Sequence, residues 1–254
     1  MKYFYSFSQY YEDLVLHEAL KDVKSDDIFW IDIGANDPFL FSDTKAFSLS
    51  GGRGINVEPL RDKYELLVQD RPRDISLNLA LGEKEGVVPI VVNGCMSTVA
   101  DIAESRWKKS SLVKMKTFNQ IADRYVRKHD IHFCKIDVEG YEKSVIKGMN
   151  LIKYRPWILL IESNGEEYRE WENDILNAQY EFVMQDKINR WYIACEKPEL
   201  KQKVKPSNGL LDEYLVVREC EYIDAISREM RRTWSFRIGY SILEPFRKLG
   251  NILK

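Results

Sequence analysis

The sequence predicts an α/β fold, in which a mostly parallel β-sheet carries helices on both faces. Short apolar runs that end in turns alternate with segments of helical periodicity, and this alternation is typical of successive βαβ units. Late in the pattern, two apolar runs separated by a short polar turn predict a hairpin that adds an antiparallel strand. The chain of 254 residues is long enough for one such domain with an appendage.

Each strand is predicted from a short apolar run bounded by turn-forming residues. The parallel strands are expected at Ile28–Ile33, Gly54–Pro59, Ile75–Leu81, Ile131–Val138 and Trp157–Ile161. Less regular strands are expected at Val87–Val92 and Val113–Met115, and the hairpin at Tyr180–Met184 and Trp191–Cys195.

The helices are predicted from apolar spacing together with capping residues. Ser8 is expected to cap a helix that begins near Tyr11, and Thr117 is expected to cap a helix that runs through Val126. Pro59 suits the first turn of a third helix. Further helices are expected at 42–49, 141–149 and 166–178.

The composition excludes several classes of protein. Hydrophobic residues make up 44% of the chain, which is too many for a disordered protein. A net charge of −2 lacks the basic footprint of an obligate nucleic-acid binder, so no nucleic-acid partner is expected. The four cysteines form no C-x-x-C pair, and the first residues lack the apolar run of a signal peptide. We therefore expect a cytoplasmic protein.

The charge is divided unevenly along the chain. Residues 228–254 carry a net charge of +5, which leaves −7 for residues 1–227. We therefore divide the chain into a catalytic domain, residues 1–200, and a basic, helical C-terminal extension, residues 201–254. Aromatic residues among the basic ones suit peripheral contact with the inner face of a membrane. Packing on the body, or pairing with a second copy in a homo-oligomer, is the alternative.

Polar residues follow each predicted parallel strand, where an open α/β sheet binds its ligands. The ends of the five strands offer, in order, Asp32, Gly34 and Asn36; Glu58; Asn78 and Ala80; Asp137 and Glu139; and Glu162. Glu58 stands where a carboxylate accepts hydrogen bonds from ribose hydroxyls, which points to a cofactor that contains a nucleoside.

The turn after the first strand discriminates between cofactors. It reads Gly34-Ala35-Asn36-Asp37-Pro38 and lacks the second and third glycines of a dinucleotide-binding turn. Its acid would repel a pyrophosphate but would tolerate a cationic cofactor without phosphates. S-adenosylmethionine fits this description. An NAD-dependent oxidoreductase and a non-catalytic cofactor-binding scaffold are the alternatives.

Six segments in this order and spacing resemble the FkbM family of S-adenosylmethionine-dependent methyltransferases. They are Ser8–Asp13, Ile31–Asn36, Asn56–Pro59, Ala80–Gly82, Lys135–Glu142 and Ile161–Ser163. The resemblance implies a class I methyltransferase (Rossmann-like) fold with a seven-stranded sheet whose last strand is antiparallel. It also implies O-methylation, often of a sugar hydroxyl in a sugar nucleotide or bacterial surface glycan.

On these grounds the cofactor is expected to contact Gln9, Asp32, Gly34, Ala35, Asn36, Glu58, Asn78, Ala80, Ser97 and Asp137. The catalytic residues are expected to be Asp137, Glu139 and Glu162. A sugar hydroxyl needs a base to accept its proton, and we favour a carboxylate on the turn after the fourth strand. Alternatively, the same three carboxylates hold a divalent cation such as Mg²⁺, which would acidify the hydroxyl.

Overall fold

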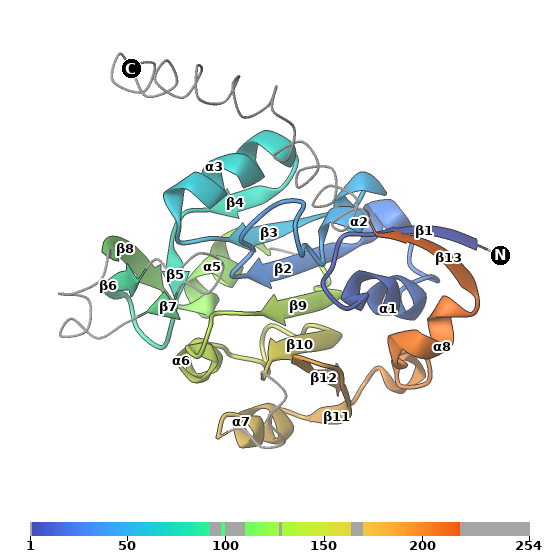
Figure 1. Ribbon diagram of the computed structural model, residues 1–254. Coiled ribbons are helices and arrows are strands. Elements are labelled where there is room, and N and C mark those ends of the chain that lie inside the picture. The colour runs from blue at the N-terminus through green and yellow to red at the C-terminus, as the bar shows by residue number, and fades with distance from the viewer. Residues whose placement is uncertain (1, 92–97, 100–109, 127–128, 164–169, 219–254) are drawn as a thin grey trace, which may run out of the picture.

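The computed structural model describes residues 2–91, 98–99, 110–126, 129–163 and 170–218 (Figure 1). Its strands are β1 (Lys2–Ser6), β2 (Phe29–Ile33), β3 (Arg53–Val57), β4 (Ile75–Leu77), β5 (Ala80–Leu81), β6 (Gly86–Val91), β7 (Thr98–Val99), β8 (Ser110–Lys116), β9 (Phe133–Ile136), β10 (Ile158–Glu162), β11 (Tyr180–Gln185), β12 (Asn189–Ala194) and β13 (Tyr214–Arg218). Its α-helices are α1 (Glu12–Ala19), α2 (Lys45–Leu49), α3 (Arg61–Asp70), α5 (Phe118–Tyr125), α6 (Glu142–Lys147), α7 (Glu172–Asn177) and α8 (Ser207–Leu211).

The predicted α/β architecture is confirmed. Within the described residues, seven strands form the main sheet in the order β11-β12-β10-β9-β2-β3-β4. The pairings from β4 to β10 are parallel, whereas β12 runs antiparallel to both β10 and β11. The predicted hairpin is therefore confirmed as well. All the parallel strands end at the same edge of the sheet, which the site occupies (Figure 1).

Alternation along the strands divides the core between the two faces of the main sheet. One face buries Ile31 of β2 and Cys134 of β9 against side chains of α5, α6 and α7. The opposite face buries Trp30 and Phe133 against side chains of α1, α2 and α8. Successive side chains of a strand point to opposite faces, so residues two positions apart share a face. Asp32 therefore lies on the same face as Trp30, and Lys135 on the same face as Phe133.

The third predicted strand is wrong in one respect. The segment expected as a single strand, Ile75–Leu81, is divided into β4 and β5, which belong to different sheets. The two strands separate at Asn78. The side-chain amide of Asn78 donates to the backbone carbonyls of Glu58 and Pro59, in the loop that follows β3. Among the described residues, β5 joins a second sheet in the order β5-β8-β6-β7. Periodicity alone does not register this bend, because both halves are apolar.

The two ends of the described chain meet in a separate ribbon. β1 pairs in parallel with β13, with Lys2 opposite Tyr214. Residues 201–218, which the sequence assigns to the extension, thus contact the N-terminal segment, while residues 219–254 and any helix there lie outside the described part. The boundary at residue 200 stays a prediction. No helix in the described ranges is long and apolar enough to cross a lipid bilayer.

The two helix caps predicted from the sequence, Thr117 and Ser8, differ in how closely the structure matches them. Thr117 caps α5 as predicted, since its Oγ1 accepts from the backbone N–H of Gln120, and the Gln120 side chain accepts from the N–H of Thr117. Ser8 is not the N-cap residue of α1, which is Tyr11, but its hydroxyl accepts from the backbone N–H of Asp13 in the first turn of the helix at 3.3 Å. The same hydroxyl donates to the Asp13 carboxylate.

We expect Thr117→Ala to lower the free energy of unfolding by about 1 kcal/mol, because the N-terminal amides of α5 lose their side-chain acceptor. Thr117→Ser keeps the hydroxyl and serves as the control, which we expect to stay close to wild type. Urea denaturation of the three proteins measures both changes. Equal stability of Thr117→Ala and wild type would contradict the role of this cap.

Candidate active site

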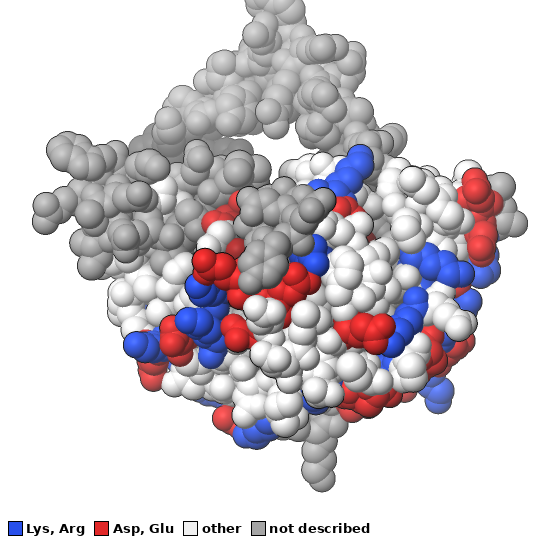
Figure 2. Space-filling view, turned by 90° about the horizontal axis from the view of Figure 1, so that it is seen from below, with Lys and Arg blue, Asp and Glu red and all other residues white. Residues whose placement is uncertain are grey.

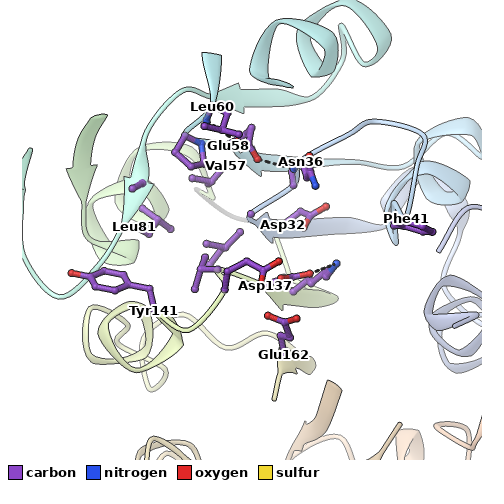
Figure 3. Close-up of a pocket in the computed structure, with 18 of the residues that line it drawn as sticks. Asp32, Asn36, Phe41, Val57, Glu58, Leu60, Leu81, Asp137, Tyr141 and Glu162 are labelled. Carbon is purple, nitrogen blue, oxygen red and sulfur yellow. Dashed lines mark hydrogen bonds and ion pairs between the residues drawn. The ribbon is translucent and has the colours of Figure 1, made fainter. Parts of the chain in front are cut away.

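A cavity of about 320 Å³ opens at the carboxyl ends of the parallel strands (Figure 3). This edge is where open α/β sheets bind their ligands. The structure brings most of the predicted site residues together in its wall, namely Gln9, Asp32, Gly34, Ala35, Asn36, Glu58, Ala80, Asp137, Glu139 and Glu162. Ser97 lies outside the described residues, so its predicted role is untested.

Gly34 allows the first turn to pass close to the end of β9. Its φ of +88° lies in the left-handed region, and a Cβ on it would stand 1.8 Å from the carbonyl oxygen of Asp137. The backbone N–H groups of Gly34 and Ala35 both donate to the carbonyl of Val57 at the end of β3. A side chain at position 34 would therefore separate the strand ends that form the cavity.

Glu58 holds the same turn from the side of β3. Its carboxylate accepts from the backbone N–H of Asn36 at 2.8 Å and from that of Leu60 at 2.6 Å. Burial raises the pKa of Glu58 to about 7, although both backbone bonds oppose the shift. A carboxylate offers about four acceptor positions, so it keeps capacity for a ligand hydroxyl.

Asn78 is not among the residues that line the cavity, so its predicted contact with the cofactor stays a prediction. Its side-chain amide donates to the carbonyls of Glu58 and Pro59 at 3.0 and 2.9 Å. Asn78 thus fixes the loop that carries Glu58, and acts on the site through that residue.

Asp32 lines the cavity, and one of its carboxylate oxygens has no partner among the described residues. Its Oδ2 accepts from the hydroxyl of Thr44 at 3.0 Å, and Thr44 in turn accepts from the buried guanidinium of Arg71. Its Oδ1 is buried without a hydrogen-bond partner among the described residues. Burial raises the pKa of Asp32, while the charge of Lys135 works in the opposite direction. An unpaired buried carboxylate oxygen is costly unless a ligand donates to it.

Lys135 is the cation of the site, and the sequence analysis assigned it no role. It pairs in register with Asp32 across β9 and β2. Its ammonium lies 3.0 Å from a carboxylate oxygen of Asp43 and 3.1 Å from one of Asp137. Burial alone would lower the pKa of Lys135, but these neighbouring carboxylates outweigh burial and raise it. The lysine therefore stays charged.

Three carboxylates meet at the opening of the cavity. Of the described residues, Asp137, Glu139 and Glu162 each bring a carboxylate oxygen within 4.8 Å of the other two. Burial and the charge of Asp137 raise the pKa of Glu139 to about 7 and that of Glu162 to about 9. Glu162 is therefore protonated at neutral pH, whereas Glu139 titrates there. Carboxylates with separated pKa values can serve as acid and base in one site.

The N-terminal segment forms another side of the cavity through Gln9. Asp13 of α1 holds this segment, because its buried carboxylate accepts from the backbone N–H of Phe7 and the hydroxyl of Ser8, each at 2.7 Å. Glu12 accepts from Asn189 at 3.2 Å and so ties the segment to β12.

Comparison with protein-family models gives one match that covers most of the chain. The model of the methyltransferase FkbM domain matches residues 32–223. The chain belongs to the FkbM methyltransferase family. No curated protein matches it. The resemblance predicted from the six segments is thereby confirmed, and the family suggests S-adenosylmethionine as the cofactor of this FkbM methyltransferase.

The cavity of this FkbM methyltransferase has two different ends. The end near β3 and β5 is apolar and is lined by Val57, Leu60, Leu79, Ala80, Leu81 and Ile90. The opposite end contains Phe41, which lies across Asp32 from Leu81 in Figure 3. Sequence reasoning missed Phe41 because an aromatic residue in a predicted loop carries no motif; its left-handed backbone shows only in the structure.

We expect Gly34→Ala to be far more destabilising than Gly140→Ala. Gly140 also has a positive φ, +96°, but a Cβ there would meet nothing within 4 Å. Gly140→Ala should therefore cost only the backbone strain, about 1–2 kcal/mol, whereas Gly34→Ala adds the collision with Asp137. Denaturation and calorimetry with S-adenosylmethionine measure stability and cofactor binding. Similar losses of unfolding free energy in the two variants would argue against the close approach of Gly34 to the carbonyl of Asp137.

The proton on Glu162 predicts a pH-dependent stability. The folded protein keeps this proton up to about pH 9, whereas an exposed glutamate in the unfolded chain ionises near its ordinary pKa of about 4.3. Between these pH values the folded state binds the extra proton, so wild-type stability falls as pH rises. Glu162→Gln removes that dependence.

We therefore expect the free energy of unfolding of Glu162→Gln, relative to that of wild type, to increase steadily from about pH 5.5 to about pH 8.5. Urea denaturation in the presence of a chelator, which removes any bound cation, measures the difference. A difference that stays constant with pH would show that Glu162 ionises normally in the folded protein.

Proposed function

We propose that the protein is an S-adenosylmethionine-dependent O-methyltransferase that acts on a sugar hydroxyl, in a sugar nucleotide or a bacterial surface glycan. The observation that carries the proposal is the group of three carboxylates at the opening of the cavity, beside a wall suited to a cationic nucleoside cofactor. The fold proposed for it is the class I methyltransferase fold with a mostly parallel seven-stranded sheet, followed by a helical extension.

The described residues fit this cofactor. The apolar end of the cavity suits an adenine ring, and Glu58 has spare acceptor positions for ribose hydroxyls. The unpartnered Oδ1 of Asp32 suits the ammonium of the methionine part. The surrounding acids favour the positive sulfonium. When bound, the cofactor supplies an electrophilic methyl group.

Glu139 is the base that the proposal favours. Its pKa of about 7 lets it be ionised at neutral pH and still hold a proton taken from the acceptor. Asp137, by contrast, is already paired with Lys135 at 3.1 Å. In this mechanism Glu139 would take the hydroxyl proton of the acceptor, and Asp137 and protonated Glu162 would orient the acceptor by hydrogen bonds. The bound cofactor would supply the methyl group and would leave as the neutral thioether, S-adenosylhomocysteine.

A divalent cation such as Mg²⁺ is the second candidate for activating the hydroxyl. Three carboxylate oxygens within 4.8 Å of one another supply the hard ligands that Mg²⁺ prefers. The ammonium of Lys135 competes for one of them, since it lies 3.1 Å from Asp137. When bound, the ion would lower the pKa of the sugar hydroxyl.

The proposal includes the cellular location of the enzyme and the partner of its C-terminal end. A carbohydrate acceptor made inside the cell would place it in the cytoplasm. The basic, aromatic end of the chain suits contact with the inner face of a membrane, or with a second subunit. The described body carries charges of both signs on the face seen in Figure 2, where acidic side chains gather near the centre.

The first experiment identifies the acceptor. Sugar nucleotides and glycans are incubated with the full chain and S-adenosylmethionine, and mass spectrometry detects the gain of a methyl group. Calorimetry with S-adenosylmethionine and with NAD separates the proposal from an oxidoreductase. Binding of S-adenosylmethionine without transfer to any carbohydrate would contradict the sugar acceptor.

With an acceptor identified, we expect Glu139→Gln to lower kcat by about 10²–10⁴-fold, because the amide cannot take the proton. Affinity for S-adenosylmethionine should change little. Glu83→Gln, at an exposed glutamate outside the cavity wall, is the control and should keep wild-type kcat. Wild-type turnover in Glu139→Gln would exclude Glu139 as the base.

The same assay separates the two ways of activating the hydroxyl. If Glu139 acts alone, turnover is unchanged in EDTA. If a cation acts, EDTA abolishes turnover and added Mg²⁺ restores it.

A further inference from the structure

The loop between β2 and α2 lines the cavity and is held by a set of buried hydrogen bonds. The buried guanidinium of Arg71 donates to the carbonyl of Pro38 at 2.7 Å, to the hydroxyl of Ser42 at 2.6 Å and to that of Thr44 at 2.6 Å. The backbone N–H of Ser42 also donates to the carbonyl of Phe7 at 3.1 Å. The loop is therefore fixed on both sides of residues 39–41.

Phe41 stands within this fixed loop in an unfavourable conformation. Its φ of +60° is left-handed, which is uncommon for a bulky residue, and its side chain is 43% exposed. Neither the strain nor the exposure of an aromatic ring stabilises the fold. Strained residues that the surroundings hold in place cluster at ligand sites. Phe41 lines the cavity, so the strain has a reason if a ligand covers the ring.

The position of Phe41 selects the acceptor as that ligand. The apolar residues suited to adenine lie at the other end of the cavity, across Asp32 in Figure 3. Gln9, Ile188 and the carboxylates of Glu139 and Glu162 line the same cavity as Phe41. This combination offers one apolar surface and several hydrogen-bonding groups.

We propose that Phe41 is the platform on which a pyranose ring of the acceptor stacks. The C–H bonds on one face of a pyranose form an apolar patch that packs on the electron-rich face of an aromatic ring. Its hydroxyls then reach carboxylates, which accept hydrogen bonds. The inference rests on the proposed function, since it assigns the acceptor side of the same site.

The same loop contains a matched control. Phe39 is 40% exposed, close to the value for Phe41, but it does not line the cavity. Its ring already has partners: the ammonium of Lys45 lies 3.9 Å from its centroid, and the ring of Phe7 packs edge-on at 6.5 Å. Removing Phe39 therefore tests the cost of losing an exposed aromatic ring from this loop without touching the platform.

The test measures binding of simple sugars by the full chain in the presence of S-adenosylhomocysteine. The probes are the methyl α-glycosides of glucose, galactose, mannose and rhamnose, and saturation-transfer NMR titrations give their affinities. The variants are Phe41→Ala, Phe41→Tyr and Phe39→Ala. Calorimetry with S-adenosylhomocysteine checks that each variant is folded and still binds the cofactor product.

We expect Phe41→Ala to bind its best glycoside about tenfold more weakly than wild type, because the aromatic contact is lost. Phe41→Tyr keeps the ring and should restore the affinity, and Phe39→Ala should bind like wild type. Affinity for S-adenosylhomocysteine should stay the same in all three.

Two results would overturn the platform while leaving the sugar acceptor standing. One is wild-type glycoside affinity in Phe41→Ala. The other is a loss of S-adenosylhomocysteine affinity in Phe41→Ala with unchanged glycoside affinity, which would assign Phe41 to the cofactor. If wild type binds S-adenosylhomocysteine but none of the glycosides, the sugar acceptor itself fails, and the platform fails with it.

Discussion

The site depends on one buried cation, Lys135. β9 places it beside β2, in register with Asp32, and its ammonium contacts the carboxylates of Asp43 and Asp137. Uncompensated burial of these acids would cost several kcal/mol for each ion, so a lysine between them lets a sheet edge carry so many carboxylates. Removal of Lys135 would leave the carboxylates of Asp43 and Asp137 buried without a cationic partner. These residues therefore depend on one another.

The three clustered acids near Lys135 have different electrostatic surroundings. Asp137 contacts the lysine directly, while burial and the charge of Asp137 raise the pKa values of Glu139 and Glu162 to about 7 and about 9. Glu139 and Glu162 therefore differ in pKa within one small group of acids. The proposed mechanism uses this difference, with Glu139 as the proton acceptor and Glu162 as a hydrogen-bond donor.

The sequence was sufficient to predict most strands of the main sheet and the acids that follow them, because burial imposes apolar runs and the strand ends meet at one edge. It did not predict β1 or β13, which pair with one another across the length of the chain. It could not reveal contacts made between distant segments. Asn78 supports Glu58 instead of lining the cavity, and the run around it divides between two sheets. Lys135 lies inside the recognised motif, but its role as a buried cation depends on the carboxylates of Asp43 and Asp137, which tertiary structure brings to it.

Arg71 links the two halves of the cavity through the same loop. Through Thr44 it orders Asp32, which the proposal assigns to the cofactor, and through Pro38 and Ser42 it fixes the segment that carries Phe41, which the proposal assigns to the acceptor. Methyl transfer requires the donor carbon and the acceptor oxygen to be aligned at close range, so their separation must be fixed. A single buried guanidinium that positions both sides makes that separation a property of the folded loop, independent of either ligand.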